Sequence, residues 1–173
     1  GATALRMIDR RDAIDSVDGE RAHQARSSEG LVVLSRSEEL VSASLSDQQL
    51  SYRYSSVEDD AERDAYLRSR SDSTVFHLSG WSRAVERAFG AQRRDLIATR
   101  GDEIVGVLPI SECKRPLGGS NWISAPWGVY GGPVSNSPEI SRELVKVAMQ
   151  RAGESDARRL ELRCLEAPKF EGF

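Results

Sequence analysis

The sequence predicts an α/β fold with a mixed sheet flanked by helices. Short runs that alternate apolar and polar side chains indicate strands, and longer segments with apolar residues three and four apart indicate helices. In chain order these patterns predict a strand, two helices, three strands, a helix and a last strand. A chain of 173 residues has the length of one domain with an extension.

The expected domain begins with a strand and two helices. Residues 50–57 alternate aromatic or aliphatic with polar side chains, which is typical of a strand. Residues 59–70 contain good helix formers with a modest apolar face. A better marked helix spans residues 79–90, where Ser79 is a candidate N-cap and Gly90 ends the pattern. We expect the apolar face of this second helix to consist of four residues: Trp81, Ala84, Val85 and Ala88.

A hairpin, a third strand, a helix and a final strand follow. Two apolar runs, residues 95–100 and 103–110, flank the turn dipeptide Gly101-Asp102. Pro109 cannot donate a ladder hydrogen bond, so we expect a bulge or a sheet edge near it. The remaining elements are predicted at three ranges: a strand at 121–125, a helix at 137–152 and a strand at 159–165.

The composition of the two ends predicts how the chain is divided. Residues 1–49 are rich in charged residues and serine and contain one compact apolar run, so we expect a disordered or loosely attached extension. The domain itself is predicted to span residues 50–166, and residues 167–173 form a tail. No run approaches the ~20 apolar residues of a membrane span, so none is predicted.

Charge and cysteine content narrow the partners and cofactors. The net charge of −3 argues against a domain that binds the DNA backbone. Cys113 and Cys164 stand in apolar runs without metal-ligand spacing, so we expect buried thiols, no metal site and a reducing, cytoplasmic location. With only two histidines, neither a metal cluster nor a Ser-His-Asp arrangement can be traced.

The segment from Asn121 to Pro133 is the candidate site, because it combines aromatic side chains with glycines and contains no charged residue. We expect Trp127 and Tyr130, beside Gly131 and Gly132, to line a ligand pocket next to the following helix. Simple packing is the alternative for each of these residues.

Three other residues, at two places in the chain, carry chemistry that a site would use. His77 precedes a helix and is a candidate binding residue or general base, with a packing role as the alternative. Glu161 and Arg163 are expected on the solvated face of the last strand. No residue is assigned a catalytic role.

Four short motifs carry a family resemblance: Phe76-His77-x-x-Gly80-Trp81, Ile104-Val-Gly-Val-Leu-Pro109, Tyr130-Gly131-Gly132-Pro133 and Leu160-Glu161-Leu162-Arg163. In this order and spacing, residues 74–165 resemble the N-terminal half of FemAB-like proteins. These are relatives of the GNAT acyltransferases that include peptidoglycan aminoacyltransferases, and the similarity is greatest to the branch associated with PEP-CTERM and exosortase systems.

The resemblance implies a GNAT-like fold and a cytoplasmic transferase. Such an enzyme moves an acyl or aminoacyl group onto a peptidoglycan or exopolysaccharide precursor, with acyl-CoA or aminoacyl-tRNA as possible donor. The family has two GNAT-like halves in tandem, so we expect either a truncated member of the family or a second chain that supplies the other half.

The turn that would hold the pyrophosphate of acyl-CoA, residues 128–133, departs from the family pattern. It lacks the usual leading Arg or Gln and contains Pro133, which removes an amide donor. Binding of CoA is therefore not expected. Two alternatives stay open: an inactive GNAT-fold binding or scaffold module, and an acyl-CoA-dependent N-acetyltransferase.

Overall fold

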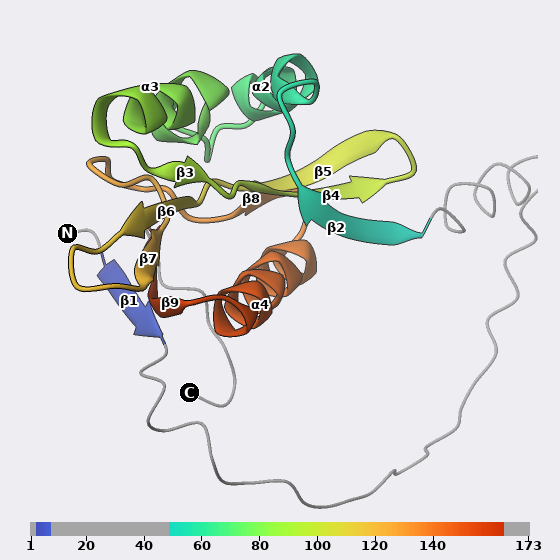
Figure 1. The fold of residues 1–173 in the computed structure, drawn as a ribbon. Helices are drawn as coiled ribbons and strands as arrows, with labels where there is room; N and C mark the ends of the chain where they lie inside the picture. Colours follow the sequence, from blue (N-terminus) through green and yellow to red (C-terminus); the bar gives the residue numbers. More distant parts are fainter. Residues whose placement is uncertain (1–2, 8–48, 165–173) are drawn as a thin grey trace, which may run out of the picture.

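The computed structural model describes residues 3–7 and 49–164, and within these ranges the chain has a mixed α/β fold (Figure 1). The helices are α2 (Asp60–Arg68), α3 (Ser79–Phe89) and α4 (Pro138–Glu154), with a 3-10 turn, η1 (Val75–His77). The strands are β1 (Thr3–Met7), β2 (Leu50–Tyr54), β3 (Gln92–Arg93), β4 (Leu96–Arg100), β5 (Glu103–Leu108), β6 (Ser111–Lys114), β7 (Ser120–Ile123), β8 (Val134–Ser135) and β9 (Ala157–Cys164).

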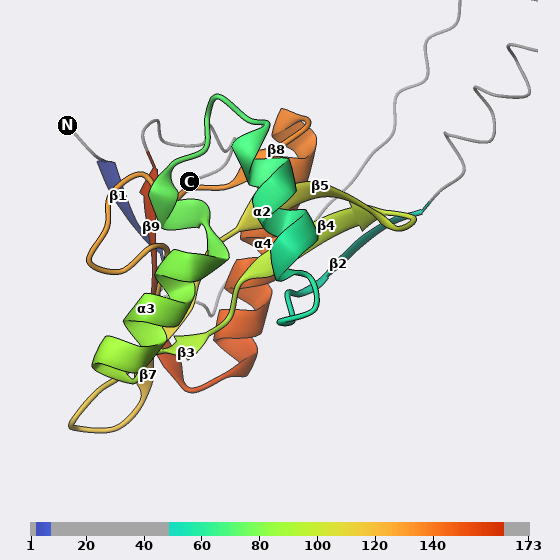
Figure 2. The same cartoon turned by 90° about the horizontal axis from the view of Figure 1, so that it is seen from above.

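These strands form two sheets. One sheet has the order β1-β9-β7-β6-β3 and the other the order β2-β4-β5-β8. The pairs are antiparallel except for β7 and β9, which run parallel because α4 connects β8 to β9 as a crossover. Helices α2 and α3 lie on one side of the strands and α4 on the other (Figures 1 and 2).

The two sheets are halves of one bent sheet, because three stretches of chain pass from one into the other. The stretches are β3 to β4, β5 to β6, and β7 to β8. Between the halves, the Arg94 amide still donates to the Ile110 carbonyl, 2.8 Å away. The strand predicted over residues 103–110 ends at Leu108, directly before Pro109, and β6 begins after the bend. The expected irregularity at Pro109 is therefore confirmed as a break between strands.

The main apolar core lies between α4 and the strands. Ile140, Leu144 and Ala148 face this core from α4 and are at most 4% exposed. The helix packs closely, since a Cβ added at Gly106 of β5 would stand 2.9 Å from the Cγ2 atom of Ile140. A smaller cluster lies on the α2 side of the sheet: Leu67, Ile97, Ile104, Val107 and Val134.

Helix α3 differs from its prediction at the start and on its buried face. Its N-cap is Leu78, and Ser79 donates from its amide and hydroxyl to the Asp64 carboxylate at 2.8 and 2.9 Å. The expected Ser79 cap is thus wrong: a carboxylate from α2 supplies the negative group at this N-terminus. Gly90 ends the helix with φ of 65°, as predicted.

The buried side of α3 is partly polar, whereas the predicted face was entirely apolar. Ser82 and Val85 are buried, whereas Ala84 and Ala88 are exposed and Trp81 is half-buried. The helix is turned in this way because the Ser82 hydroxyl donates to the buried Asp95 carboxylate at 3.0 Å. A tertiary hydrogen bond therefore overrides the local apolar pattern.

Several strands were not predicted, namely β1, β3, β6 and β8. Three of them have only two to four residues, too few for a periodic signal. β1 pairs with residues of β9 that lie 153 to 161 positions further along the chain. Most of the extension predicted at residues 1–49, and the tail at 167–173, lie outside the described residues.

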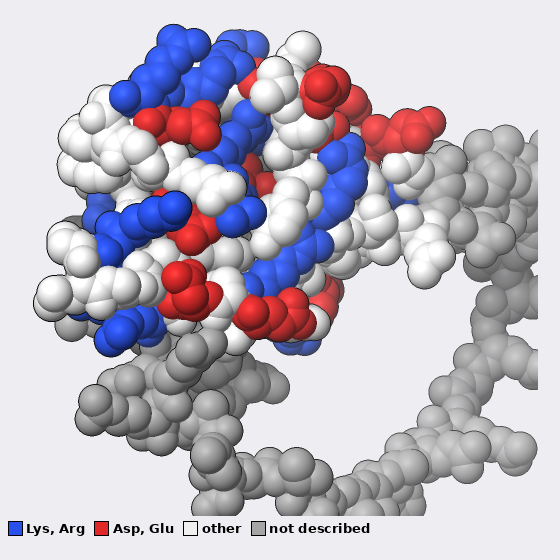
Figure 3. Space-filling model, in the orientation of Figure 1, with Lys and Arg blue, Asp and Glu red and all other residues white. Residues whose placement is uncertain are grey.

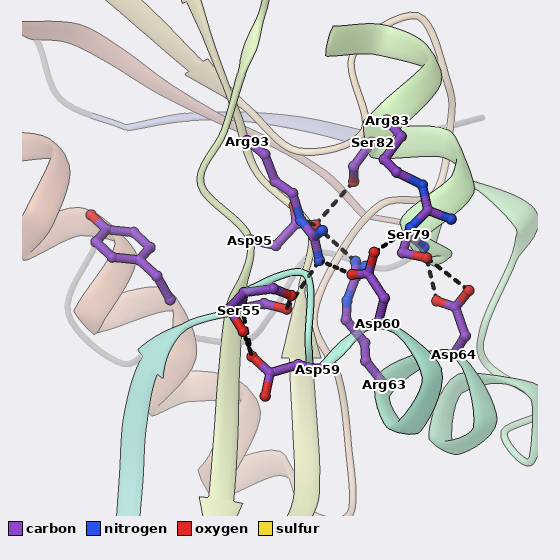
Figure 4. A network of polar contacts seen from close by, with 12 residues as sticks. Ser55, Asp59, Asp60, Arg63, Asp64, Ser79, Ser82, Arg83, Arg93 and Asp95 are labelled. Atoms are coloured by element: carbon purple, nitrogen blue, oxygen red, sulfur yellow. Dashed lines mark hydrogen bonds and ion pairs between the residues drawn. The ribbon is translucent and has the colours of Figure 1, made fainter. Parts of the chain in front are cut away.

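A network of charged side chains joins α2 and α3 to the bend of the sheet (Figure 4). At its centre Arg63 and Asp95, both 0% exposed, form an ion pair at 3.0 Å. The Asp95 carboxylate also accepts from Arg93 at 2.9 Å and from the Ile110 amide at 2.8 Å. Arg93 in turn pairs with Asp60 at 2.6 Å.

We predict that Asp95→Asn lowers the free energy of unfolding by about 3–5 kcal/mol, because removing one partner of a buried pair leaves an uncompensated charge. Chemical denaturation would measure the change. The matched control is Glu143→Gln, whose ion pair with Lys146 is exposed and should contribute less than about 1 kcal/mol. Equal effects of the two changes would contradict the central role of Asp95.

Candidate functional site

The candidate site is a loop that interrupts one strand of the bent sheet. β7 pairs with β6 up to Ile123 opposite Ser111, and β8 resumes with Val134 opposite Val107. Ten residues, 124–133, therefore lie opposite three residues, 108–110. The glycine-rich segment noted in the sequence is thus a large bulge, which is a common means of re-aiming a strand beside a site.

The backbone of this loop is strained at positions that are not glycine. Ala125, Trp127 and Tyr130 have positive φ values of 43°, 58° and 57°. Each such residue costs about 1–2 kcal/mol, so the surrounding contacts must hold the loop in shape. This distribution reverses the usual one, since the glycines of the loop are not among the positive-φ residues.

The glycines of the loop are needed for space. A Cβ at Gly128 would lie 2.6 Å from the Phe76 ring, and one at Gly131 would lie 2.3 Å from the Cβ of Ala125. A Cβ at Gly132 would lie 2.9 Å from the Cys164 sulfur. The loop therefore packs directly against η1, against itself and against the end of β9.

Four side chains from three elements hold alternate carbonyl groups of the loop. Their carbonyl partners belong to Pro126, Gly128, Tyr130 and Gly132. The donors, in the same order, are Trp81 Nε1 at 3.3 Å, Arg163 Nη1 at 3.0 Å, Thr74 Oγ1 at 3.5 Å and His77 Nε2 at 3.0 Å. In a trans peptide the N–H points opposite to the C=O. The amides of residues 127, 129 and 131 therefore point away from these donors.

The buried His77 side chain links η1 to the loop. Its Nδ1 atom accepts from the Thr74 amide at 3.0 Å, so Nε2 carries the proton and donates to the Gly132 carbonyl. The Thr74 hydroxyl and the His77 ring together form a capping box. The Arg63 guanidinium donates to the His77 carbonyl at 2.6 Å. His77 is thereby connected to the buried ion pair.

The environment of His77 favours the neutral ring. Burial is the main cause that lowers its pKa below the ordinary 6.5, and the Arg63 charge acts in the same direction. With 1% exposure and both ring nitrogens hydrogen-bonded, the side chain has no nitrogen directed at solvent. Its geometry fits a positioning role.

The aromatic residues of the loop differ in exposure. Trp127 is 53% exposed and stacks on Phe89 at the end of α3, with ring centroids 3.8 Å apart and planes 10° apart. Phe89 is itself 56% exposed, and Tyr130 is half-buried. The sequence did not indicate Phe89, because it lies outside the predicted apolar face of α3. Trp127 thus contacts the end of α3, and the sequence did not predict this contact.

The end of β9 supplies the remaining support. Glu161 is only 9% exposed and accepts from Arg159 at 2.9 Å and from Arg163 at 3.0 Å. The Arg163 amide donates to the Ser124 hydroxyl at 2.7 Å. The expected solvated face is therefore wrong for Glu161, whose carboxylate is paired with the arginines on either side.

The cysteines are in keeping with inert thiols. Cys164 is buried, and burial raises its pKa to about 11. Cys113 is partly buried, and its pKa is also raised by burial. A thiol with a raised pKa is a poor nucleophile at neutral pH.

Comparisons with known proteins identify no relative of this chain. No protein family, characterised protein or solved structure matches it. The described residues contain no group of three metal-binding side chains and no helix long and apolar enough to cross a membrane. Acidic and basic side chains are intermingled on the face shown in Figure 3, in keeping with the small net charge.

We predict that acidification from pH 7.5 to 5.5 destabilises the protein through His77. Because its folded pKa is lowered, the unfolded chain binds the proton first as the pH falls through about 6.5, and stability declines. The loss can reach about 1.4 kcal/mol for one pKa unit. Denaturant unfolding at the two pH values measures it.

The control for this prediction is His77→Gln, which cannot titrate. This variant is less stable at pH 7.5 but should lose much less on acidification than the parent. Most carboxylates titrate near pH 4, so the window isolates the histidines. Identical pH dependence in parent and variant would contradict the assignment.

We predict that Gly131→Ala displaces the loop, because the new Cβ would stand 2.3 Å from Ala125, and that it costs about 1–3 kcal/mol. Gly80→Ala is the matched control, since a Cβ there meets nothing within 4 Å and alanine is a better helix former. Melting temperatures and Trp127 fluorescence report stability and loop position. A Gly131→Ala protein indistinguishable from the parent would refute this packing.

Proposed function

We propose that this chain is a GNAT-like, FemAB-type half of a cytoplasmic transferase, which binds an envelope precursor so that an acyl or aminoacyl group can be transferred to it. The single observation that carries the proposal is the convergence of the motifs on one loop. Phe76 packs on Gly128, His77 donates to Gly132, and Trp81 donates to Pro126.

The last motif reaches the same loop from β9. Arg163 of β9 donates to the Gly128 carbonyl, and Cys164 packs against Gly132. The motif over residues 104–109 ends at the bend opposite the loop. Residues scattered over ninety positions therefore build one local structure, which supports their reading as a functional unit.

The loop offers the groups that an acyl transfer needs for positioning. The amides of residues 127, 129 and 131 are oriented by carbonyls that side chains hold, and fixed N–H donors stabilise a developing oxyanion without reorganisation. The exposed Phe89–Trp127 stack provides an apolar surface beside them. In the proposed reaction, the acceptor amine attacks an activated ester carbonyl that is held in this geometry.

The start of α4 disfavours acyl-CoA as the donor. Ser137 caps this helix, its hydroxyl accepting from the Ile140 amide, and Pro138 has no N–H. Glu139 places a carboxylate in the first turn, where it would repel a pyrophosphate. In the proposed GNAT-like arrangement, the chain's own groups would therefore occupy the site that binds the CoA phosphates.

The alternative of a binding module without catalysis is favoured by His77. Its two ring nitrogens are hydrogen-bonded and its side chain is buried, so it has no free position to accept a proton from a substrate. On this reading, the chain binds the precursor and a second half or partner chain performs the chemistry.

The test is calorimetric titration of the chain with CoA and, separately, with a nucleotide-linked peptidoglycan precursor. We expect no binding of CoA and measurable binding of the precursor. Trp127→Ala and Phe89→Ala should each weaken that binding at least tenfold, because they remove the stacked surface. Leu117→Ala, at a side chain that is 88% exposed on the β6–β7 turn, should leave it unchanged.

Each outcome separates the candidate functions. Micromolar CoA binding would favour an ordinary acetyltransferase and contradict the proposal. If neither ligand binds, the inactive scaffold module remains the better account and the proposal is contradicted. If the chain binds the precursor but transfers nothing, and transfer appears when a second half is added, the result would support the binding module.

A further inference from the structure

The outer edge of β9 is covered by a strand from the other end of the sequence. β1 pairs antiparallel with β9 over all five of its residues, from Thr3 opposite Cys164 to Met7 opposite Leu160. β1 is therefore an edge strand of this sheet. Residues 8–49 separate it from β2, and Figure 1 shows it lying beside β9.

This edge needs a strand because β9 is long and buried. β9 has eight residues, and Leu160, Leu162 and Cys164 are at most 4% exposed. On the opposite edge its pairing with β7 stops at Glu161. Within the described chain, residues 162–164 therefore have β1 as their strand partner. Uncovered, this edge would present unpaired N–H and C=O groups and invite another strand.

We propose that the outer edge of β9 is a strand-docking site that β1 of a second copy of the chain also fills, giving a strand-exchanged dimer. The backbone pairing and register would be the same in both arrangements, since exchange swaps identical elements. The sequence that fits the edge is already present in every copy, which identifies the partner as this chain itself.

The connection between β1 and β2 permits either arrangement. Forty-two residues, 8–49, span up to about 140 Å when fully extended, far more than the width of a small domain. Linkers of this length give effective concentrations on the order of millimolar or below. Pairing within one chain should therefore dominate at micromolar concentration, and exchange should grow as the concentration approaches millimolar.

The test uses the full chain with a thiol at position 3. The register sets Thr3→Cys opposite the native Cys164, and residues directly opposite in an antiparallel pair have Cβ atoms about 4.5–5.5 Å apart. Cys113→Ser in the same chain removes the other thiol. The buried Cys164 thiol, with its pKa raised to about 11, reacts slowly, so oxidation at pH 8.5 is continued until the linked fraction is constant. It is done over a range of protein concentrations, and non-reducing electrophoresis then separates linked monomers from linked dimers.

The matched control is Ala4→Cys in the same background, because successive positions of a strand face opposite sides of the sheet. We expect Thr3→Cys to give linked monomers at low concentration and at least a fivefold higher fraction of linked dimers near millimolar. Ala4→Cys should give neither. Linked monomers alone at every concentration would overturn the exchange, no link would overturn the pairing, and dimers of both variants would show nonspecific oxidation and overturn it too.

Discussion

The buried Asp95 carboxylate is the constraint on which the arrangement of helices and sheet depends. It stands where the sheet bends and accepts hydrogen bonds from the Ile110 amide, from Ser82 of α3 and from Arg63 of α2. A carboxylate without exposure is costly unless each oxygen is paired. Asp95 therefore fixes two helices and the bend together, because a shift of any of them would leave a charge uncompensated.

The same network reaches the candidate site through one side chain. Arg63 pairs with Asp95 and also donates to the His77 carbonyl, while the His77 ring donates to Gly132. The strain of three left-handed residues in the loop is offset by these fixed donors. Rigid support would suit the function proposed for this loop, in which its amides are oriented before a ligand arrives, since reorganisation during a reaction would raise its barrier.

The sequence predicted the elements whose signals are local and missed the contacts that join them. The end of α3 at Gly90 and the β4–β5 hairpin follow from turn and helix chemistry. Burial of Arg63 could not be foreseen, because a charged residue in a helix is ordinarily solvated. Likewise, nothing in the sequence marked Trp127 and Tyr130 as left-handed, because they adopt this backbone through tertiary hydrogen bonds that hold their neighbouring carbonyls.

β9 connects the candidate site to the edge of the sheet. Arg163 holds the loop, and Cys164 packs against Gly132 while it pairs with Thr3. The strand that covers this edge therefore also supports the backbone beneath the loop. If β1 comes from a second copy, as proposed, each loop would rest on a β9 that its partner completes. Dimer formation and the shape of the site would then be linked through the two residues at the end of one strand.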